Sequence, residues 1–278
     1  MCHILQVSRS AYYGWYSGQS HQVSDSDKKL AESVTEVFQV HRSRYGSRRI
    51  MYELRKRDLF VSRKTVSKTM QKLDLKAIQP RSFVPRTTDS RHSYHVNENL
   101  LLHSGPANSP NRIWVGDITY IPMAGGGWSF LSTWMDLYSR RIVGWELADH
   151  MKETLVIESF KRARRRRSVP KGLIVHTDRG GQYAGKSFRM LLGEDVRQSM
   201  SRADDPYDNA FMESFYSRFK AEMLGDGRFL TIEDARTEIF EFIEMYYNTI
   251  RIHSSLSYQS PMEYEEEYHR NASKKAIT

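Results

Sequence analysis

The sequence predicts an α/β protein that follows a small all-α domain. Runs of β-branched and aromatic residues, separated by short turns, dominate the middle of the 278-residue chain. Before them, apolar residues recur with helical spacing, and a polar stretch with four prolines and no periodic pattern then indicates a linker. We expect an N-terminal arm with a short helical piece (1–22), a helical domain (23–78), a linker (79–110), an α/β core (111–268) and a C-terminal tail (269–278).

Three helices are predicted in the helical domain. The pattern turns helical from Ser24, with Asp25 or Ser26 able to cap the first helix, and the apolar positions of this helix are Leu30, Val34, Val37 and Phe38. The second runs from Ser47 to about Arg57. Ser62 can cap the third, and its apolar positions are Val66, Met70 and Leu73. The lengths of the last two helices and the turn between them are typical of a helix-turn-helix.

The α/β core begins with three predicted strands that form an antiparallel meander, at Ile113–Ile121, Trp128–Asp136 and Ile142–Ala148. A helix over Glu153–Arg166 and a buried strand over 172–177 follow, and a helix capped by Asp208 carries Glu213. Three strands, a helix, another strand and more helices are the order expected of a ribonuclease-H-like α/β fold.

Composition restricts the function. The 42 Lys and Arg residues exceed the 33 Asp and Glu residues, which gives a net charge of +9 and favours a polyanionic partner such as nucleic acid over a basic enzyme kept soluble by charge. Cys2 is the only cysteine, so an intrachain disulfide or a cysteine zinc site is excluded. No apolar run is long enough for a signal peptide or a membrane span, so we expect a cytoplasmic protein without a membrane partner.

Basic residues cluster on the last two helices of the helical domain. The candidates for DNA contact are Arg48, Arg49, Arg63, Lys64 and Lys68. Such side chains suit phosphates and base edges. The alternative is a three-helix bundle with an ordinary solvated basic face.

Three carboxylates stand out in the core. Asp117 lies inside a β-branched strand, where burial is costly without a partner, and Asp178 lies where an apolar strand meets a glycine-rich turn. Glu213 begins a helix, with Lys220 two turns further on the same face. Each acid alone has an ordinary structural explanation. Together, three hard oxygen ligands on separate elements can hold one or two Mg²⁺ ions for phosphoryl transfer.

The residues around these acids resemble a known family. Trp-x-x-Asp-Ile-Thr-Tyr at 114–120, His-x-Asp-Arg-Gly-x-Gln-Tyr at 176–183 and Tyr-Asp-Asn-Ala-x-x-Glu-Ser-Phe at 207–215 are similar to motifs of bacterial insertion-sequence transposases of the IS3 group, in their OrfB half. Tyr-Tyr-Asn at 246–248 with Arg251, His253 and Ser260-Pro261 resembles the C-terminal signature of that family. The departures, Gly116 where Thr is more usual and Thr177 and Gly181 where Ser is commoner, replace none of the acids.

The resemblance implies a retroviral-integrase-like core with a mixed five-stranded sheet. Asp117, Asp178 and Glu213 would be its catalytic, metal-binding triad, with two Mg²⁺ ions (Mn²⁺ as a substitute), and Lys220 would grip phosphate near the scissile bond. The implied activity is DNA cleavage that frees a 3′-OH, followed by direct transesterification. The implied partners are the terminal inverted repeats of the element, target DNA, further copies of the chain, and an upstream OrfA product or a fusion with it.

Three other functions stay open. Residues 180–187 fit the P-loop pattern Gly-x4-Gly-Lys-Ser, which suggests an ATPase, although the preceding meander is wrong for a P-loop domain. A DNA-binding regulator with an inactive core is the second. A plain nuclease with the same triad is the third, because cleavage alone needs no strand transfer.

Several other polar residues receive structural interpretations. Asp136 is expected to be a structural acid at a strand end, and His176 is expected to pack or hydrogen-bond rather than bind metal. Residues 162–167 are either a DNA-tracking or a solvated basic run. The acids at 263–267 are expected to form a solvated helix face, and a helix capped by Thr231 is expected to pack in the core.

Overall fold

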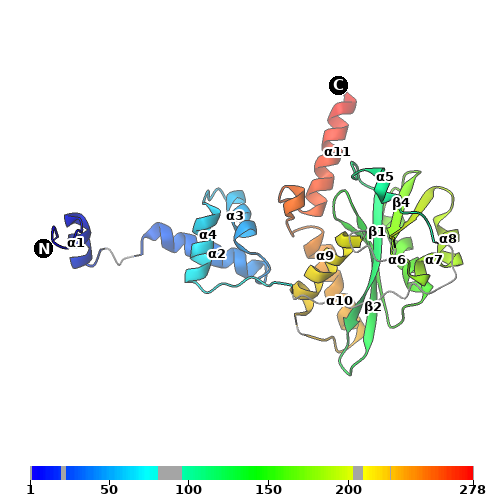
Figure 1. The fold of residues 1–278 in the computed structure, drawn as a ribbon, viewed down its shortest axis with the longest axis horizontal. Coiled ribbons are helices and arrows are strands. Elements are labelled where there is room, and N and C mark those ends of the chain that lie inside the picture. The colour runs from blue at the N-terminus through cyan, green and yellow to red at the C-terminus, as the bar shows by residue number, and fades with distance from the viewer. Residues whose placement is uncertain (1, 20–22, 81–95, 203–208, 226, 278) are drawn as a thin grey trace. The chain divides into compact units, whose positions relative to one another are not determined.

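The computed structural model describes residues 2–19, 23–80, 96–202, 209–225 and 227–277 (Figure 1). They fall into two compact units, one within residues 1–78 and one within 79–278. Among the helices so described, none is long and apolar enough to cross a membrane.

The first unit is helical. Its helices are α1 (Arg9–Tyr16), α2 (Asp25–Val40), α3 (Ser47–Lys56) and α4 (Arg63–Lys72). The core between α2, α3 and α4 contains Val34, Val37, Phe38, Ile50, Leu54, Val66 and Met70. Ser62 caps α4 as predicted, since its hydroxyl accepts a hydrogen bond from the amide of Thr65.

Two predictions in this unit are wrong in detail. The cap of α2 is Ser24 itself, whose hydroxyl accepts from the amide of Asp27, and neither Asp25 nor Ser26 has that role. Leu73 lies outside the apolar face because α4 ends at Lys72 and the chain turns at Asp74 with a φ of 51°. The Leu73 side chain is therefore 40% exposed.

The second unit contains a mixed five-stranded sheet in the order β3-β2-β1-β4-β5. The strands are β1 (Ile113–Pro122), β2 (Trp128–Asp136), β3 (Ile142–Ala148), β4 (Leu173–Thr177) and β5 (Val196–Met200). β1, β2 and β3 pair antiparallel, whereas β4 is parallel to both β1 and β5. The predicted meander and the ribonuclease-H-like order of elements are confirmed.

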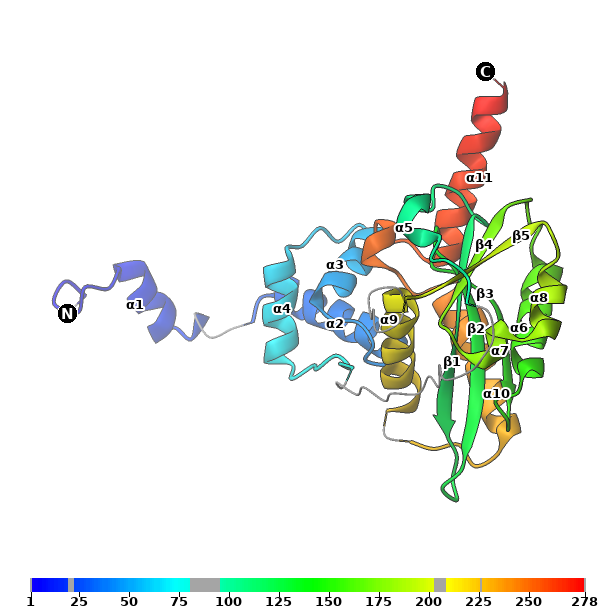
Figure 2. The same ribbon diagram turned by 45° about the vertical axis from the view of Figure 1, so that its right-hand side comes forward.

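Helices cover both faces of the sheet (Figure 2), and each face carries its own apolar core. Trp114 of β1 belongs to the core under α6 (Glu153–Arg166), α7 (Gly181–Ala184) and α8 (Lys186–Leu192). Val115 points the other way, into the core under α9 (Ala210–Phe219) and α10 (Ile232–Phe240). Because side chains alternate along a strand, Asp117 shares the face of Val115 and is directed toward α9.

Segments at both ends of the core carry more structure than the sequence suggested. Within the stretch predicted as a linker, α5 (Leu101–Ser104) forms, and the amide of Leu100 donates to Ser199 Oγ of β5 at 2.9 Å. At the other end, α11 (Pro261–Ile277) continues past residue 268, the predicted end of the core, into the predicted tail. Single π-helical segments extend α9 over Lys220–Leu224 and α10 over Glu241–Tyr247.

A buried charge network corrects two interpretations of surface charge. Arg167 donates to Glu265 and to Asp136, and Arg141 also donates to Glu265. Glu265 is only 3% exposed, so this member of the acidic run is not on a solvated face. Arg162 and Arg166 pair with Glu146 and Glu244. The Arg162 and Arg166 side chains stay 41% and 49% exposed, so among these three arginines only Arg167, at 11%, departs from a solvated or DNA-tracking run.

Candidate active site

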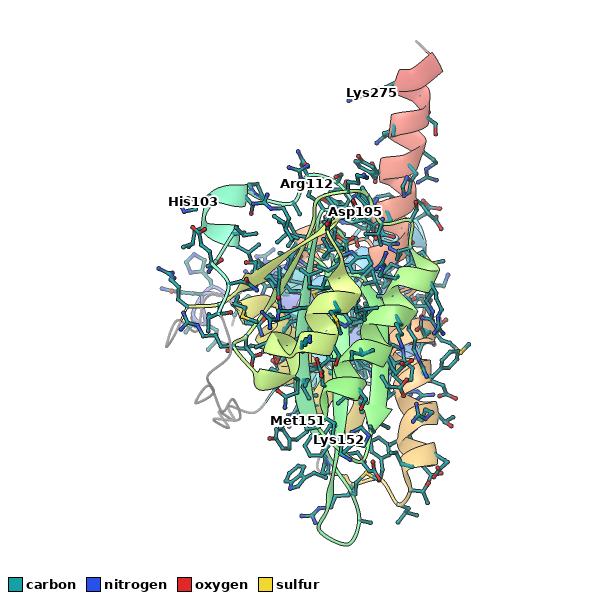
Figure 3. All side chains as sticks on the ribbon, turned by 90° about the vertical axis from the view of Figure 1, so that its right-hand side faces the viewer. His103, Arg112, Met151, Lys152, Asp195 and Lys275 are labelled. Carbon is teal, nitrogen blue, oxygen red and sulfur yellow. The ribbon has the colours of Figure 1, made fainter. Side chains whose placement is uncertain are left out.

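The two aspartates meet because β1 and β4 run side by side in the same direction. Gly116 of β1 is paired with Thr177 of β4, so the residues that follow them, Asp117 and Asp178, lie at matching positions in neighbouring segments of the chain. Figure 3 shows Arg112 and Asp195, which precede β1 and β5, at one end of the sheet, and Met151 and Lys152, which follow β3, at the other. Asp178 follows the last residue of β4 and so lies toward this second end.

Main-chain amides orient both aspartates. Asp117 Oδ1 accepts a hydrogen bond from the amide of Ile118 at 2.8 Å, and Asp178 Oδ1 accepts one from the amide of Gly180 at 3.0 Å. Glycine suits position 180 because a Cβ there would lie 3.1 Å from Asp178 Oδ1. The turn after β4 therefore orients the Asp178 carboxylate next to the end of the strand.

Glu213 reaches the same region from α9. It lies in the first turn of that helix, on an exposed position. The N-cap residue is Asn209, which makes no side-chain capping bond, and the predicted cap Asp208 lies outside the described residues.

Tyr216 pins α9 to the strand that carries Asp117. Its buried hydroxyl donates to the main-chain oxygen of Asp117 at 2.7 Å and lies 2.8 Å from Thr133 Oγ1 of β2. Sequence reasoning missed this residue. The available signal was its position three residues after Glu213, which places it on a neighbouring part of the helix surface.

The electrostatics show that the three acids share one environment. Burial raises the pKa of Asp117 well above its ordinary value, and the charges of Asp178 and Glu213 raise it further. The Ile118 amide and the Lys220 ammonium act in the opposite direction and lower this pKa. The pKa of Lys220 is itself lowered by burial and raised by Asp117. A cation bound among these carboxylates would remove the repulsion between them.

The donor set suits a hard divalent cation, because all three side chains offer carboxylate oxygens. Within the described ranges, however, no three His, Cys, Asp or Glu side chains are arranged closely enough to hold a metal ion as they stand. The exposed Glu213 on α9 is the ligand candidate that would have to approach the aspartate pair.

The P-loop interpretation is wrong. Residues 180–187 do not form a single phosphate-cradling loop, because Gly181–Ala184 is helical. At the start of α8, the amide of Phe188 donates to Glu153 Oε1 at 2.7 Å, so a carboxylate occupies the position that a phosphate would need. A Cβ at Gly185 would lie 2.3 Å from the same oxygen.

The other polar residues of the core have structural partners. Asp136 is fully buried and accepts from the amides of Asn111 and Tyr138, as expected of a structural acid. His176 is buried and hydrogen-bonded on both ring nitrogens to Ser199 and Ser201, at 2.8 and 3.2 Å, as expected of a histidine that hydrogen-bonds within the core.

In the helical unit, the predicted DNA-contact residues lie on the surface. Arg48, Arg63, Lys64 and Lys68 are exposed. Arg49 is half-buried, with its guanidinium 5.3 Å from the centre of the Tyr45 ring. The Tyr45 ring therefore gives Arg49 a contact within the helical unit.

Comparison with known proteins identifies the family. Residues 107–206 and 194–261 match two families that are both described as integrase core domain, and residues 25–83 match the HTH-like domain. The transposase for insertion sequence element IS904 of Lactococcus lactis subsp. lactis (strain IL1403) is 39% identical over 85% of this chain and 93% of its own. Transposase InsF for insertion sequence IS3A of Escherichia coli (strain K12) is 35% identical over 95% of this chain and 92% of its own. The chain belongs to the IS3 family of transposases.

A third relative matches this chain over nearly its whole length. The uncharacterized 31 kDa protein of insertion element IS600 from Shigella sonnei is 36% identical over 98% of this chain and 100% of its own. Among solved structures, the HTLV-2 integrase catalytic core domain in complex with magnesium (trimeric form) is 15% identical with a TM-score of 0.43, covering 57% of this chain and 99% of that chain. The matched family models give this IS3-family transposase an HTH-like domain and an integrase core, and the relatives confirm the recognition made from the motifs.

Proposed function

We propose that Asp117, Asp178 and Glu213 form the catalytic triad with which this transposase cleaves DNA and transfers the cut strand. The observation that carries the proposal is the convergence of three carboxylates from separate elements. Asp117 on β1 and Asp178, which directly follows β4, lie at matching positions, and Glu213 on α9 is near enough for its charge to raise the pKa of Asp117.

The three acids would hold two Mg²⁺ ions, with Mn²⁺ as a substitute. When bound, such ions activate the attacking oxygen and stabilise the leaving oxygen of a phosphoryl transfer. The chain's own residues orient this site: the Ile118 and Gly180 amides fix the aspartates, and Tyr216 fixes α9. Lys220 would bind a phosphate beside the scissile bond, since its ammonium lies within electrostatic reach of Asp117.

In the transfer step, the 3′-OH of the cleaved end attacks a second phosphodiester. Its oxygen forms a bond to phosphorus, and the bond from phosphorus to the 3′-oxygen of the attacked strand breaks. The attacking hydroxyl loses its proton to solvent, and the departing 3′-oxygen takes a proton from solvent. One triad can therefore serve both cleavage by water and joining by the 3′-OH.

DNA would be gripped chiefly by the helical unit, through the exposed basic residues of α3 and α4. The two DNA partners of the transposase would be the terminal inverted repeats of the element and the target DNA. The working form would be an oligomer of this cytoplasmic chain, with an upstream OrfA product or as a fusion to it.

The test uses a duplex that carries the terminal repeat of the DNA element encoding this chain. Wild type and Glu213→Gln are incubated with it in Mg²⁺ or in EDTA, with and without the upstream partner. We expect cleaved and joined products only from wild type in Mg²⁺. Products that persist in the variant would refute the triad, cleavage without joining would indicate a nuclease, and tight binding without any product would favour a regulator.

A further inference from the structure

Arg251, in the segment that follows α10, forms a buried ion pair with Glu222, and the proposed chemistry gives this pair no role. Arg251 Nε donates to Glu222 Oε2 at 2.8 Å, and Arg251 Nη2 donates to Glu222 Oε1 at 2.5 Å. The two side chains are only 3% and 2% exposed. Two parallel bonds between a guanidinium and a carboxylate fix both the distance and the relative orientation of the partners.

Glu222 belongs to the π-helical turn that extends α9. This turn covers Lys220–Leu224 and starts at Lys220, and the amide of Gly225 closes it by donating to the Lys220 oxygen at 3.1 Å. π-Helical turns are rare, and they occur frequently at functional sites. The direction in which Lys220 leaves the helix therefore depends on a local geometry that an α-helix would not keep by itself.

The other end of the ion pair is anchored to the sheet. The amide of Arg251 donates to the Tyr246 oxygen at 2.8 Å. Asn248, three residues earlier, bonds with both main-chain groups of Ile142 on β3, at 2.9 and 3.0 Å. Arg251 thus connects the π-helical turn to a segment that is itself tied to an edge strand.

Stability alone does not account for this arrangement. Replacing a buried ion pair by apolar side chains of similar volume is often neutral or stabilising, because two charges no longer lose their hydration. What a bidentate pair adds is a defined position for the elements that it joins.

We propose that Arg251, acting through Glu222, is a positioning residue that holds the π-helical turn so that Lys220 faces the Asp117 side of the active site. The proposal rests on the proposed function, since it assigns a role to Lys220 in the same site. It also explains why Tyr247, Asn248 and Arg251 occur together in the C-terminal motif, where the Tyr247 ring lies 5.7 Å from the Arg251 guanidinium.

The test is a double-mutant cycle on the full chain with the terminal-repeat duplex in Mg²⁺. Arg251→Met combined with Glu222→Leu removes both charges without leaving either one unpaired. Arg236→Met is the matched control, because it removes an arginine of the same unit whose partner Glu146 keeps Arg162. Thermal unfolding of every variant is measured alongside cleavage.

We expect the paired replacement to unfold at nearly the wild-type temperature but to cleave about tenfold to a hundredfold more slowly, as a displaced catalytic group does. In a Lys220→Ala background the same replacement should cause little further loss, whereas a purely structural role would cost the same in both backgrounds. Arg236→Met should cleave at the wild-type rate.

Two results would overturn the inference. One is a paired variant that folds and cleaves at the wild-type rate. The other is a fold-loss in cleavage rate from the paired replacement that is as large in the Lys220→Ala background as in wild type. If the paired variant fails to fold, Arg251→Lys, which keeps the charge but not the bidentate geometry, is carried through the same cycle. Unfolding of that variant too would show that Arg251 serves folding instead. Glu213→Gln, run in parallel, separates these outcomes from failure of the triad, because its full activity would refute the proposed function itself.

Discussion

At the residue scale, Gly116 shows how closely the active-site strand is fitted to its neighbours. A Cβ at this position would lie 2.3 Å from Trp134 Cζ3, which belongs to the paired residue on β2. The resemblance to the family made Thr the more usual residue here. The large Trp134 ring explains why this chain has glycine next to Asp117.

We therefore expect Gly116→Ala to lower the free energy of unfolding by about 1–3 kcal/mol, since the added methyl group overpacks a closed core. Gly127→Ala is the control, because a Cβ at Gly127 would meet nothing within 4 Å. Chemical denaturation measures both. Equal stability of the two variants would contradict the fit of Trp134 over Gly116.

Tyr216 is the second residue whose role is local. Tyr216→Phe removes the hydroxyl that reaches the Asp117 oxygen, and we expect a loss of about 0.5–1.5 kcal/mol in unfolding free energy. The rate of DNA cleavage should fall by about tenfold or more, even though the protein stays folded, because a shift of α9 displaces Glu213. Tyr120→Phe on β1, the strand that carries Asp117, is the control. Wild-type cleavage by Tyr216→Phe would show that α9 needs no such anchor.

His41 makes the helical unit sensitive to acid. Burial, followed by the charges of Arg44 and Arg57, lowers the pKa of His41 from 6.5 to about 4, and its ring stacks on Tyr45. Because the unfolded chain binds a proton here between pH 6.5 and 4 and the folded chain does not, stability is full above pH 6.5 and falls as the pH drops through this window.

The loss would be on the order of 3 kcal/mol at its largest. Hydrogen exchange of the α2–α4 amides in the full chain measures it at several pH values. His41→Phe keeps a ring against Tyr45 and should flatten the pH dependence between 6.5 and 4. An unchanged dependence in that variant would exclude His41 as its source.

At the element scale, periodic patterns predicted the elements well wherever one face of an element is buried. The strand Trp128–Asp136 and the helix Glu153–Arg166 have the predicted bounds. The pattern failed for Glu265, because its partners Arg167 and Arg141 come from about 100 and 124 residues away, and a local window cannot contain them. The π-helical turn at Lys220–Leu224 was not predicted either, and its Glu222 is paired with Arg251, 29 residues away in the sequence.

A substitution at Glu265 tests whether α11 presents a solvated acidic face, as the sequence suggested, or a buried carboxylate, as the structure shows. Glu265→Ala would leave Arg167 buried with fewer partners, and we expect it to lower the free energy of unfolding by about 3–5 kcal/mol. Glu266→Ala changes the exposed neighbour on the same helix and should stay within about 0.5 kcal/mol of wild type. Equal thermal unfolding temperatures for the two variants would restore the solvated-face interpretation.

At the scale of the whole molecule, the motifs indicated the three acids, but not the way in which they come together. The register that places Asp117 beside Asp178 joins strands 61 residues apart in the sequence, and only the parallel pairing of β1 with β4 reveals it. Tyr216 and Arg251 were not predicted as positioning residues, because their partners lie on other elements. The basic charge of +9, in contrast, was readable from composition and agrees with a DNA partner.

The most direct test of the triad separates joining from cleavage. A terminal-repeat duplex that already ends in a free 3′-OH is incubated in Mg²⁺ with target DNA and with wild type, Asp117→Asn, Asp178→Asn or Glu213→Gln, each supplied with the upstream partner. We predict joined strands from wild type alone, with all three variants inactive to a similar degree. Joining by any one of the variants at the wild-type rate would contradict a single site built from these three carboxylates.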